Sequence, residues 1–229
     1  MIVDKQGFHF FSDFSSMEKD VSSVIVESWL KGWSLSRKVP LPVGFKSGFK
    51  VDVGDEKQKS RYVFPKLNDD FKELSEAIDE PWVFLKVCAS VDEVSPNIPG
   101  NWTIEPQGYL MTCFRPMDFP EMSLSQDYHL EFEEYHSTYV VKILAQNGEL
   151  ASTGRVALVD DFAVYDRIIT ESHHQRKGLG RFLMKELEKI SLSKGISKKV
   201  LVATEEGKLL YQSLGWELYS LYTSVVIQA

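Results

Sequence analysis

The chain has 229 residues, of which 43% are apolar and 26% charged, and its net charge is −7. This composition is typical of a globular protein, and the acidic balance argues against a general nucleic-acid binder. No apolar run approaches the roughly 20 residues that a membrane helix needs, and the first residues lack the order of a signal peptide. We therefore expect a cytoplasmic protein that binds neither nucleic acid nor membrane.

The two cysteines, Cys88 and Cys113, follow no metal-binding or redox spacing. We expect both to be buried thiols. No His-x-x-x-His pair and no cysteine pair supports a metal site, so none is expected.

The N-terminal half is expected to open with a helix over residues 16–31. Ser15 and Glu18 fit a capping box at its start, and Gly32 is the expected stop. Within it, apolar residues recur at helical spacing: Met17, Val21, Val24, Ile25 and Trp29.

Further along, a short strand, a second helix and a buried strand are expected. Phe49, Val51 and Val53 alternate as in a strand, the helix should start after Asn68 and cover residues 69–79, and residues 83–87 form an apolar run. The aromatic residues of this half are expected mainly in the core, with some of them lining a pocket.

The stretch from Val94 to Pro120 contains five prolines and two glycines. Such a composition breaks regular structure, so this stretch is the expected boundary between two regions. We assign residues 1–115 to an N-terminal α+β region and residues 116–229 to a second domain.

The second domain alternates strands and helices. Asn147-Gly148 is typical of a tight hairpin turn, and Gly195 and Gly215 should end helices. The predicted strands cover residues 128–133, 139–145, 149–158, 163–170 and 199–203, the helices start after Gly180 and at Glu206, and residues 216–227 are expected to form a final hairpin.

The segment Gln175-Arg176-Lys177-Gly178-Leu179-Gly180 joins a predicted strand to a predicted helix. The first amides of a helix have no partner within it, and glycine lets a phosphate approach them closely. Arg181 adds a further positive charge. On the loop alone, a phosphate cradle and a mere helix start remain equally open. A Walker loop is excluded because it needs Gly-Lys followed by Ser or Thr, whereas Arg181 follows Gly180. A dinucleotide fingerprint is excluded because Leu183 stands where it needs a third glycine or alanine.

The order strand, Gln-x-x-Gly-x-Gly, helix, strand, Tyr-x-x-x-Gly-Trp resembles the GNAT superfamily of acyl-CoA-dependent N-acyltransferases, over roughly residues 125–227. The resemblance implies an α/β fold with a central mixed sheet flanked by helices, and acetyl-CoA as cosubstrate. It also implies that the backbone amides of residues 176–181 hold the diphosphate and that the strand end at Ile168, Ile169 and Thr170 pairs with the pantetheine arm.

Two further roles follow from the resemblance. Thr204 stands where the family often has an asparagine that contacts the cofactor, and Gly207 where it often has alanine, which weakens that contact. Tyr211 matches the tyrosine near the thioester sulfur that is often credited as the general acid. A packed core aromatic remains the alternative for Tyr211.

Direct transfer needs a base, because amines are mostly protonated at neutral pH. Asp166 is the leading candidate, since strand alternation places it on the same face as Ile168 and Thr170. An ion pair with a cross-strand Lys or Arg is an equal alternative. A water chain could also serve, and the other candidate carboxylates are Glu131, Glu133, Asp160 and Asp161. Solvated loop residues are the favoured interpretation of His173 and His174.

The chain departs from the family between its first two strands, where no room is left for the two helices that usually cover the acceptor side. We expect the N-terminal region to complete the acceptor side through its helices, with a degenerate copy of the same fold as the alternative. The expected reaction is acetyl transfer to a small-molecule or peptide amine in a ternary complex. A non-catalytic acyl-CoA-binding module, a longer acyl chain and a homodimer stay open, and the acidic residues mildly favour a cationic acceptor.

Overall fold

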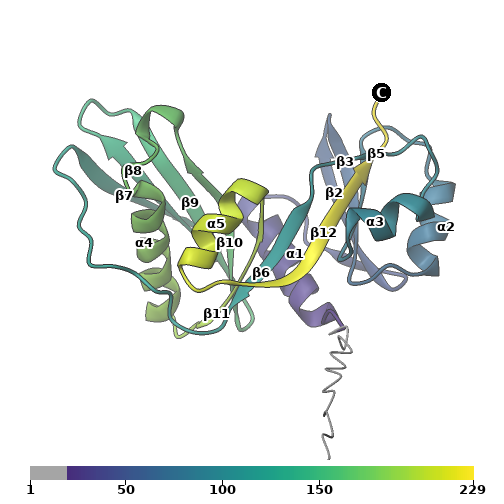
Figure 1. Ribbon diagram of the computed structural model, residues 1–229, viewed down its shortest axis with the longest axis horizontal. Coiled ribbons are helices and arrows are strands. Elements are labelled where there is room, and N and C mark those ends of the chain that lie inside the picture. The colour runs from purple at the N-terminus through teal and green to yellow at the C-terminus, as the bar shows by residue number, and fades with distance from the viewer. Residues whose placement is uncertain (1–19) are drawn as a thin grey trace, which may run out of the picture.

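A computed structural model describes residues 20–229 of the chain (Figure 1). Twelve strands in the described part form one mixed sheet in the order β1-β2-β3-β4-β12-β6-β11-β10-β9-β8-β7, with β5 beside β12. Helices pack on both faces of this sheet. The predicted α/β class with a central mixed sheet flanked by helices is therefore confirmed.

The N-terminal elements match the predicted strands and the second helix. Asn68 caps the helix that follows it, accepting a hydrogen bond from the amide of Phe71 at 3.2 Å. The elements are α1 (Ser23–Arg37), β1 (Val43–Phe45), β2 (Gly48–Asp55), β3 (Gln58–Phe64), α2 (Asp69–Ala77), β4 (Val83–Val87), α3 (Val91–Val94), the 3₁₀ turn η1 (Ser95–Asn97), β5 (Thr103–Ile104) and β6 (Gly108–Cys113).

The C-terminal elements also follow the expected order, with one exception. Residues 216–227 form no hairpin but a single long strand, because β6 and β4 pair with it in succession and no turn interrupts it. The elements are β7 (Tyr128–Tyr135), β8 (Thr138–Ala145), β9 (Leu150–Val159), β10 (Phe162–Thr170), the 3₁₀ turn η2 (Ser172–His174), α4 (Leu179–Ser193), β11 (Lys198–Ala203), α5 (Glu205–Ser213) and β12 (Glu217–Val226).

Helix α1 does not stop at Gly32, as the sequence predicted, but continues to Arg37. A Cβ built on Gly32 would lie 2.3 Å from Cγ2 of Val164, so the glycine lets α1 approach β10 closely. The helix ends instead at Lys38, which adopts the left-handed conformation with φ 57°. The expected cap at Ser15 lies outside the described residues.

Strands β6 and β12 join the two halves of the chain. β6 pairs with β11 on one side and with the first part of β12 on the other, while the last part of β12 pairs with β4. β6 lies inside the stretch predicted as the boundary, on the N-terminal side of residue 115. The division at residue 115 remains a prediction, and the strands on either side of it belong to one continuous sheet (Figure 1).

The two halves share one order of elements. In each, an antiparallel pair (β2–β3, β9–β10) leads into a helix and then a strand parallel to the second member, followed by a short helix. They differ where a cofactor would bind. β3 and β4 stay paired from Ser60 to Phe64, and Asp69 and Asp70 occupy the first turn of α2, where they disfavour an anionic ligand.

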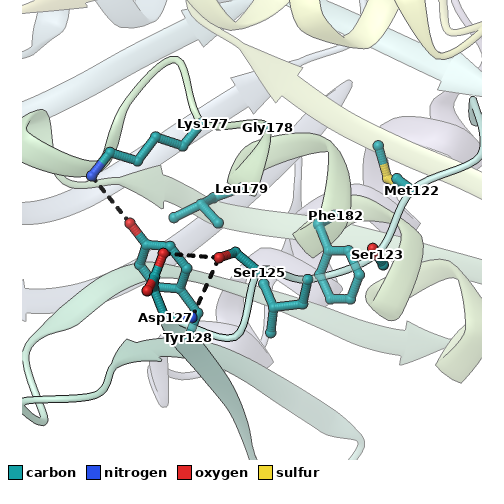
Figure 2. A pocket seen from close by; sticks show the side chains of 10 residues that line it. Met122, Ser123, Ser125, Asp127, Tyr128, Lys177, Gly178, Leu179 and Phe182 are labelled. Atoms are coloured by element: carbon teal, nitrogen blue, oxygen red, sulfur yellow. Dashed lines mark hydrogen bonds between the residues drawn. The ribbon is translucent and has the colours of Figure 1, made fainter.

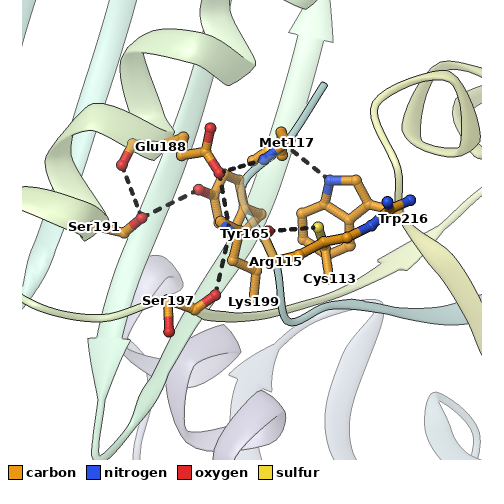
Figure 3. Close-up of polar contacts among 9 residues, drawn as sticks. All are labelled: Cys113, Arg115, Met117, Tyr165, Glu188, Ser191, Ser197, Lys199 and Trp216. Carbon is orange, nitrogen blue, oxygen red and sulfur yellow. Dashed lines mark hydrogen bonds and ion pairs between the residues drawn. The ribbon is translucent and has the colours of Figure 1, made fainter. Parts of the chain in front are cut away.

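Three apolar clusters hold these layers together. One lies between the sheet and α4 and α5, the second between the sheet and α1, and the third under α2 and α3. The first contains a buried ion pair of 2.9 Å between Lys199 on β11 and Glu188 on α4 (Figure 3). Glu188 also accepts from the amide of Met117 at 2.8 Å, and Lys199 donates to the carbonyl of Arg115 at 2.8 Å, which ties the segment after β6 to the helix.

None of the helices within residues 20–229 combines the length and apolar character that a membrane span requires. Cys88 and Cys113 are both buried and free, as predicted, and burial raises the pKa of the Cys88 thiol to about 12.

Candidate functional site

Strands β10 and β11 part in the middle of the sheet. They pair in parallel only where Phe162–Val164 of β10 lie opposite Lys198–Val200 of β11. Beyond Val200, β11 continues to Ala203 paired with β6 on one edge and with no strand on the edge that faces β10. An opening therefore separates the two strands beyond this short pairing. It leaves backbone groups of both strands without a ladder partner on the facing edges, so an extended ligand can enter between them.

A bulge in β10 shapes one side of this opening. Between Asp166 and Ile169 the register against β9 shifts by one residue, and Arg167 takes a positive φ of 51°. Asp166 keeps the α1-facing side that Val164 occupies two residues earlier, and the extra residue after it turns Ile168 to the other side, toward Leu183 on α4. The expectation that Asp166 shares a face with Ile168 and Thr170 is therefore wrong, because simple alternation fails at the bulge.

The predicted phosphate loop lies at the start of α4. Arg176 and Gly178 both adopt left-handed conformations, with φ 62° and 79°, which turns successive amides in one direction. Within residues 20–229, the amides of residues 176–181 donate to no acceptor. A Cβ on Gly178 would meet nothing within 4 Å, so the loop has open space above it.

The remaining loop residues hold this backbone in place. Gln175 donates to the carbonyl of Thr170 at 3.2 Å, and the Leu179 side chain is buried in the core. Gly180 lies close to Leu210 of α5 and to Thr170, so the helix start faces both α5 and the end of β10. Arg181 donates to the hydroxyl of Ser213 at 3.1 Å. The loop therefore lies beside both the end of β10 and α5.

A cavity of about 550 Å³ borders the other side of the loop (Figure 2). Lys177 reaches over it to the Tyr128 hydroxyl at 3.2 Å, and Gly178 and Phe182 form one wall. The facing wall is the segment before β7, residues 122–127. A second cavity, which lies on the α1 side of the sheet and is described below, shares no lining residue with this one.

The two histidines of the loop differ. His173 is exposed, as expected, but His174 is buried, which the sequence interpretation missed. Its Nδ1 lies 3.1 Å from the Tyr128 hydroxyl, and its Nε2 lies 3.6 Å from a carboxylate oxygen of Glu149. His174 thus supports the loop from below and links it to β7 and β9.

Tyr211 lies on α5, on the α4 side of the sheet. Only 7% of its surface is exposed, and its ring packs 5.9 Å from that of Trp216. Burial, together with the negative charge of Asp166, raises the pKa of Tyr211, so its hydroxyl stays protonated at neutral pH. Thr204 caps α5 by accepting from the amide of Gly207 at 3.2 Å and also lines the cavity on the α1 side.

Asp166 is committed to an ion pair. Arg37 of α1 donates from Nε at 3.0 Å and from Nη2 at 2.9 Å, and the Ser36 hydroxyl also donates to the carboxylate. Burial alone would raise the pKa of Asp166, but these hydrogen bonds and the charge of Arg37 outweigh it and hold the pKa below its ordinary value. The partner comes from α1 and not from a neighbouring strand, because the cross-strand Arg155 donates to the Ser36 carbonyl.

A cavity of about 490 Å³ opens on the α1 side of the sheet, where β10 and β11 part. Trp29, Trp33 and Arg37 line it at helical spacing on α1, which therefore covers this side of the sheet. Helix α2 does not, because it packs on the opposite face over Phe64 and Leu85. The remaining lining includes residues that sequence reasoning missed: Arg61, Lys86, Gln107, Tyr109, Glu205, Tyr222 and Ser224.

One sequence signal could have revealed this cavity. Lys86 stands inside the apolar strand Val83–Val87 and is only 8% exposed. A charged residue in the middle of a buried strand is rare and indicates a functional position. Within the described residues, no cluster of three His, Cys, Asp or Glu side chains is arranged to hold a metal ion.

Comparison with known proteins agrees with this geometry. The model of the acetyltransferase (GNAT) family matches residues 108–216. Comparison with curated proteins gives no significant match.

Solved structures match over most of the chain. A GCN5-related N-acetyltransferase from Kribbella flavida is 16% identical, with a TM-score of 0.63 over 92% of this chain and 97% of that one. A putative GNAT acetyltransferase from Novosphingobium aromaticivorans is 12% identical, with a TM-score of 0.57 over 90% and 98%. A tandem GNAT protein from the clavulanic acid biosynthesis pathway is 12% identical, with a TM-score of 0.55 over 78% of each chain. These TM-scores establish a shared fold.

Proposed function

We propose that this protein transfers an acetyl group from acetyl-CoA to an amine, because residues 108–216 match the model of the acetyltransferase (GNAT) family. The observation that carries the proposal is that three features lie close together in space. They are the unpaired amides at the start of α4, the strand end at Thr170, and the opening between β10 and β11. A phosphate, an extended amide arm and a thioester fit these three positions in that order.

The pyrophosphate would lie on the amides of residues 176–181, where the helix dipole and Lys177 favour negative charge. The pantetheine arm would pair with the backbone of Ile168, Ile169 and Thr170. The cavity beside Tyr128 suits the adenosine end, since an aromatic ring and a lysine border it next to the loop.

In the reaction, the amine nitrogen attacks the thioester carbonyl carbon, a C–N bond forms and the C–S bond breaks. Tyr211 would donate its proton to the departing thiolate, and a backbone amide of β10 would polarise the carbonyl oxygen. The ammonium must first lose a proton. The pKa values of both carboxylates that line the cavity, Asp166 and Glu205, are lowered, so we infer that the proton passes to water rather than to either of them.

For the N-terminal half we propose a degenerate copy of the same fold that has lost its cofactor site and now shapes the acceptor side. The shared order of elements supports this, as does the similarity to a protein described as a tandem GNAT. The acidic start of α2 and the unbroken pairing of β3 with β4 explain why only one half would bind a cofactor.

Two measurements test the proposed function together. Calorimetry with acetyl-CoA and longer acyl-CoA thioesters should give one site per chain with the acetyl form preferred, and thiol release should accompany transfer to members of a broad amine panel. Tight binding of acetyl-CoA without transfer to any amine would favour a non-catalytic module. A preference for longer thioesters in both assays would instead favour a different acyl donor.

A further inference from the structure

The cavity on the α1 side contains two buried cations on neighbouring strands. Arg61 of β3 is 6% exposed and Lys86 of β4 is 8% exposed, and the strand register places both on the face that carries α1. Ser224 and Tyr222 of β12 share this face beside Lys86. Four polar side chains from three adjacent strands therefore converge on one wall of the cavity.

Neither cation has a carboxylate partner. Among residues 20–229, no Asp or Glu oxygen lies within 4.0 Å of the charged nitrogens of Arg61 or Lys86, although many exposed lysines have such a partner. Lys86 donates to the Ser224 hydroxyl at 2.7 Å. The Arg61 guanidinium stacks on Trp33, with its carbon 3.4 Å from the ring centroid. When the amide oxygen of Gln58 is turned toward Arg61, it accepts from Nη2 at 2.7 Å and from Nε at 3.2 Å.

A third group on the same wall also lacks a partner. The hydroxyl of Tyr222 is buried and, within the described part of the chain, makes no hydrogen bond. Buried polar groups are nearly always satisfied, and a buried cation without a counter-charge is costly. Consistently, burial lowers the pKa of Arg61 to about 10, and burial together with the charge of Arg61 lowers the pKa of Lys86.

Asp166, the carboxylate whose charge acts on Arg61, cannot relieve this imbalance, because Arg37 and Ser36 already occupy it. Glu105, the carboxylate whose charge acts on Lys86, forms no ion pair with it among the described residues. More basic than acidic side chains therefore line the cavity: Arg37, Arg61 and Lys86 against Asp166 and Glu205. This lining favours an acceptor with a negative charge over the cationic acceptor that the overall acidic composition mildly suggested.

Resting on the proposed function, we propose that the acceptor is an amine that also carries a carboxylate, bound between Arg61, Lys86 and the Tyr222 hydroxyl. The same cavity reaches Asp166 on β10 and Thr204 just after β11, so a molecule anchored by its carboxylate directs its amine toward the opening where the thioester would lie. Trp29, which also lines the cavity, offers an aromatic surface for an apolar side chain, whereas the Trp33 ring is taken up by Arg61 and Arg37. An apolar amino acid has all three features.

The test compares phenylalanine with phenylalaninamide and phenethylamine, which keep the amine and ring but lose the carboxylate charge. Phenylalanine should show a kcat/KM about 10- to 100-fold higher, and Lys86→Met should abolish most of this difference. Phosphoethanolamine, an amine that carries a phosphate in place of a carboxylate, tests whether the cavity prefers a phosphate. The control Lys59→Met removes an exposed lysine from β3, paired with Glu80, and should change neither value.

Lys86→Met should also unfold at a urea concentration no lower than the wild type, because it removes a buried charge without a counter-charge. Binding separates the outcomes: titration of phenylalanine into the protein should give a Kd that Lys86→Met raises at least tenfold, whether or not transfer occurs, while acetyl-CoA binding stays unchanged. Equal rates and equal binding for phenylalanine and its uncharged analogues, a preference for phosphoethanolamine, or a Lys86→Met variant that keeps full discrimination would each overturn the proposal. Loss of transfer alone, with carboxylate binding intact, would count only against the proposed function.

Discussion

Tyr211 combines burial with a position on the α4 side of the opening, next to Trp216. If its hydroxyl protonates the thiolate, Tyr211→Phe should lower kcat by about 100-fold and leave the acetyl-CoA Kd unchanged, because the phenyl ring keeps the packing. Thiol-release kinetics and calorimetry measure the two quantities. Tyr139→Phe on β8 is the control. Turnover at the wild-type level in Tyr211→Phe would remove the hydroxyl from the mechanism.

Asp166 should matter for stability more than for proton transfer. The side chain is 12% exposed and binds Arg37 and Ser36, so Asp166→Asn should lower the free energy of unfolding at pH 7 by about 2–4 kcal/mol. Because the folded-state pKa is lowered, this stabilisation is present above the unfolded pKa of about 3.9 and is lost as pH falls through the folded pKa.

Urea unfolding of wild type and Asp166→Asn between pH 3 and pH 8 measures this effect. The difference between them should be constant above about pH 5 and shrink below about pH 4. A rate profile whose rise near pH 7 disappears in Asp166→Asn would contradict this account and restore Asp166 as the general base.

At the scale of elements, helix α4 is flanked by a matched pair of glycines. Gly178 precedes its first residue and Gly195 follows its end; their φ values are 79° and 77°, and a Cβ at either would meet nothing within 4 Å. Alanine should cost each about 1–2 kcal/mol of backbone strain. Only Gly178→Ala should also raise the acetyl-CoA Kd, by tenfold or more, since its methyl group would point into the space left for the phosphate. Equal Kd values in calorimetry would show that the phosphates do not lie on this loop.

The sequence predicted elements better than it predicted their exceptions. Glycine spacing and apolar periodicity located the loop, α4 and β10, because those signals are local. The bulge at Arg167 escaped detection because a left-handed arginine carries no such signal. Gly32 was assigned as a stop because close approach to Val164, which is 132 positions away, cannot be recognised from neighbouring residues.

At the scale of the molecule, β6 and β12 should make the two halves interdependent. β6 lies between β11 and β12, and β12 continues to β4, so cutting the chain at residue 115 would separate β6 from both its neighbours. Residues 116–229 expressed alone should show no cooperative urea transition, whereas the full chain should show a single one by tryptophan fluorescence. A separate fragment that folds and binds acetyl-CoA would establish an independent domain.

The long-range pairs also explain which part of the site stayed hidden. Local patterns predicted the proposed cofactor side, since loop, helix and Tyr211 follow one another within about 40 residues. The proposed acceptor side joins Arg37 with Asp166 and Lys86 with Ser224, across 129 and 138 positions. Such pairs depend on sheet order and register, which a single sequence does not specify.

A crystal structure with acetyl-CoA bound tests the central claim most directly. The account predicts the pyrophosphate oxygens within about 3.2 Å of backbone amides among residues 176–181, and the thioester between β10 and β11 with its sulfur near the Tyr211 hydroxyl. A cofactor bound elsewhere, for example over α2, or one whose thioester lies outside the opening between the two strands, would contradict it.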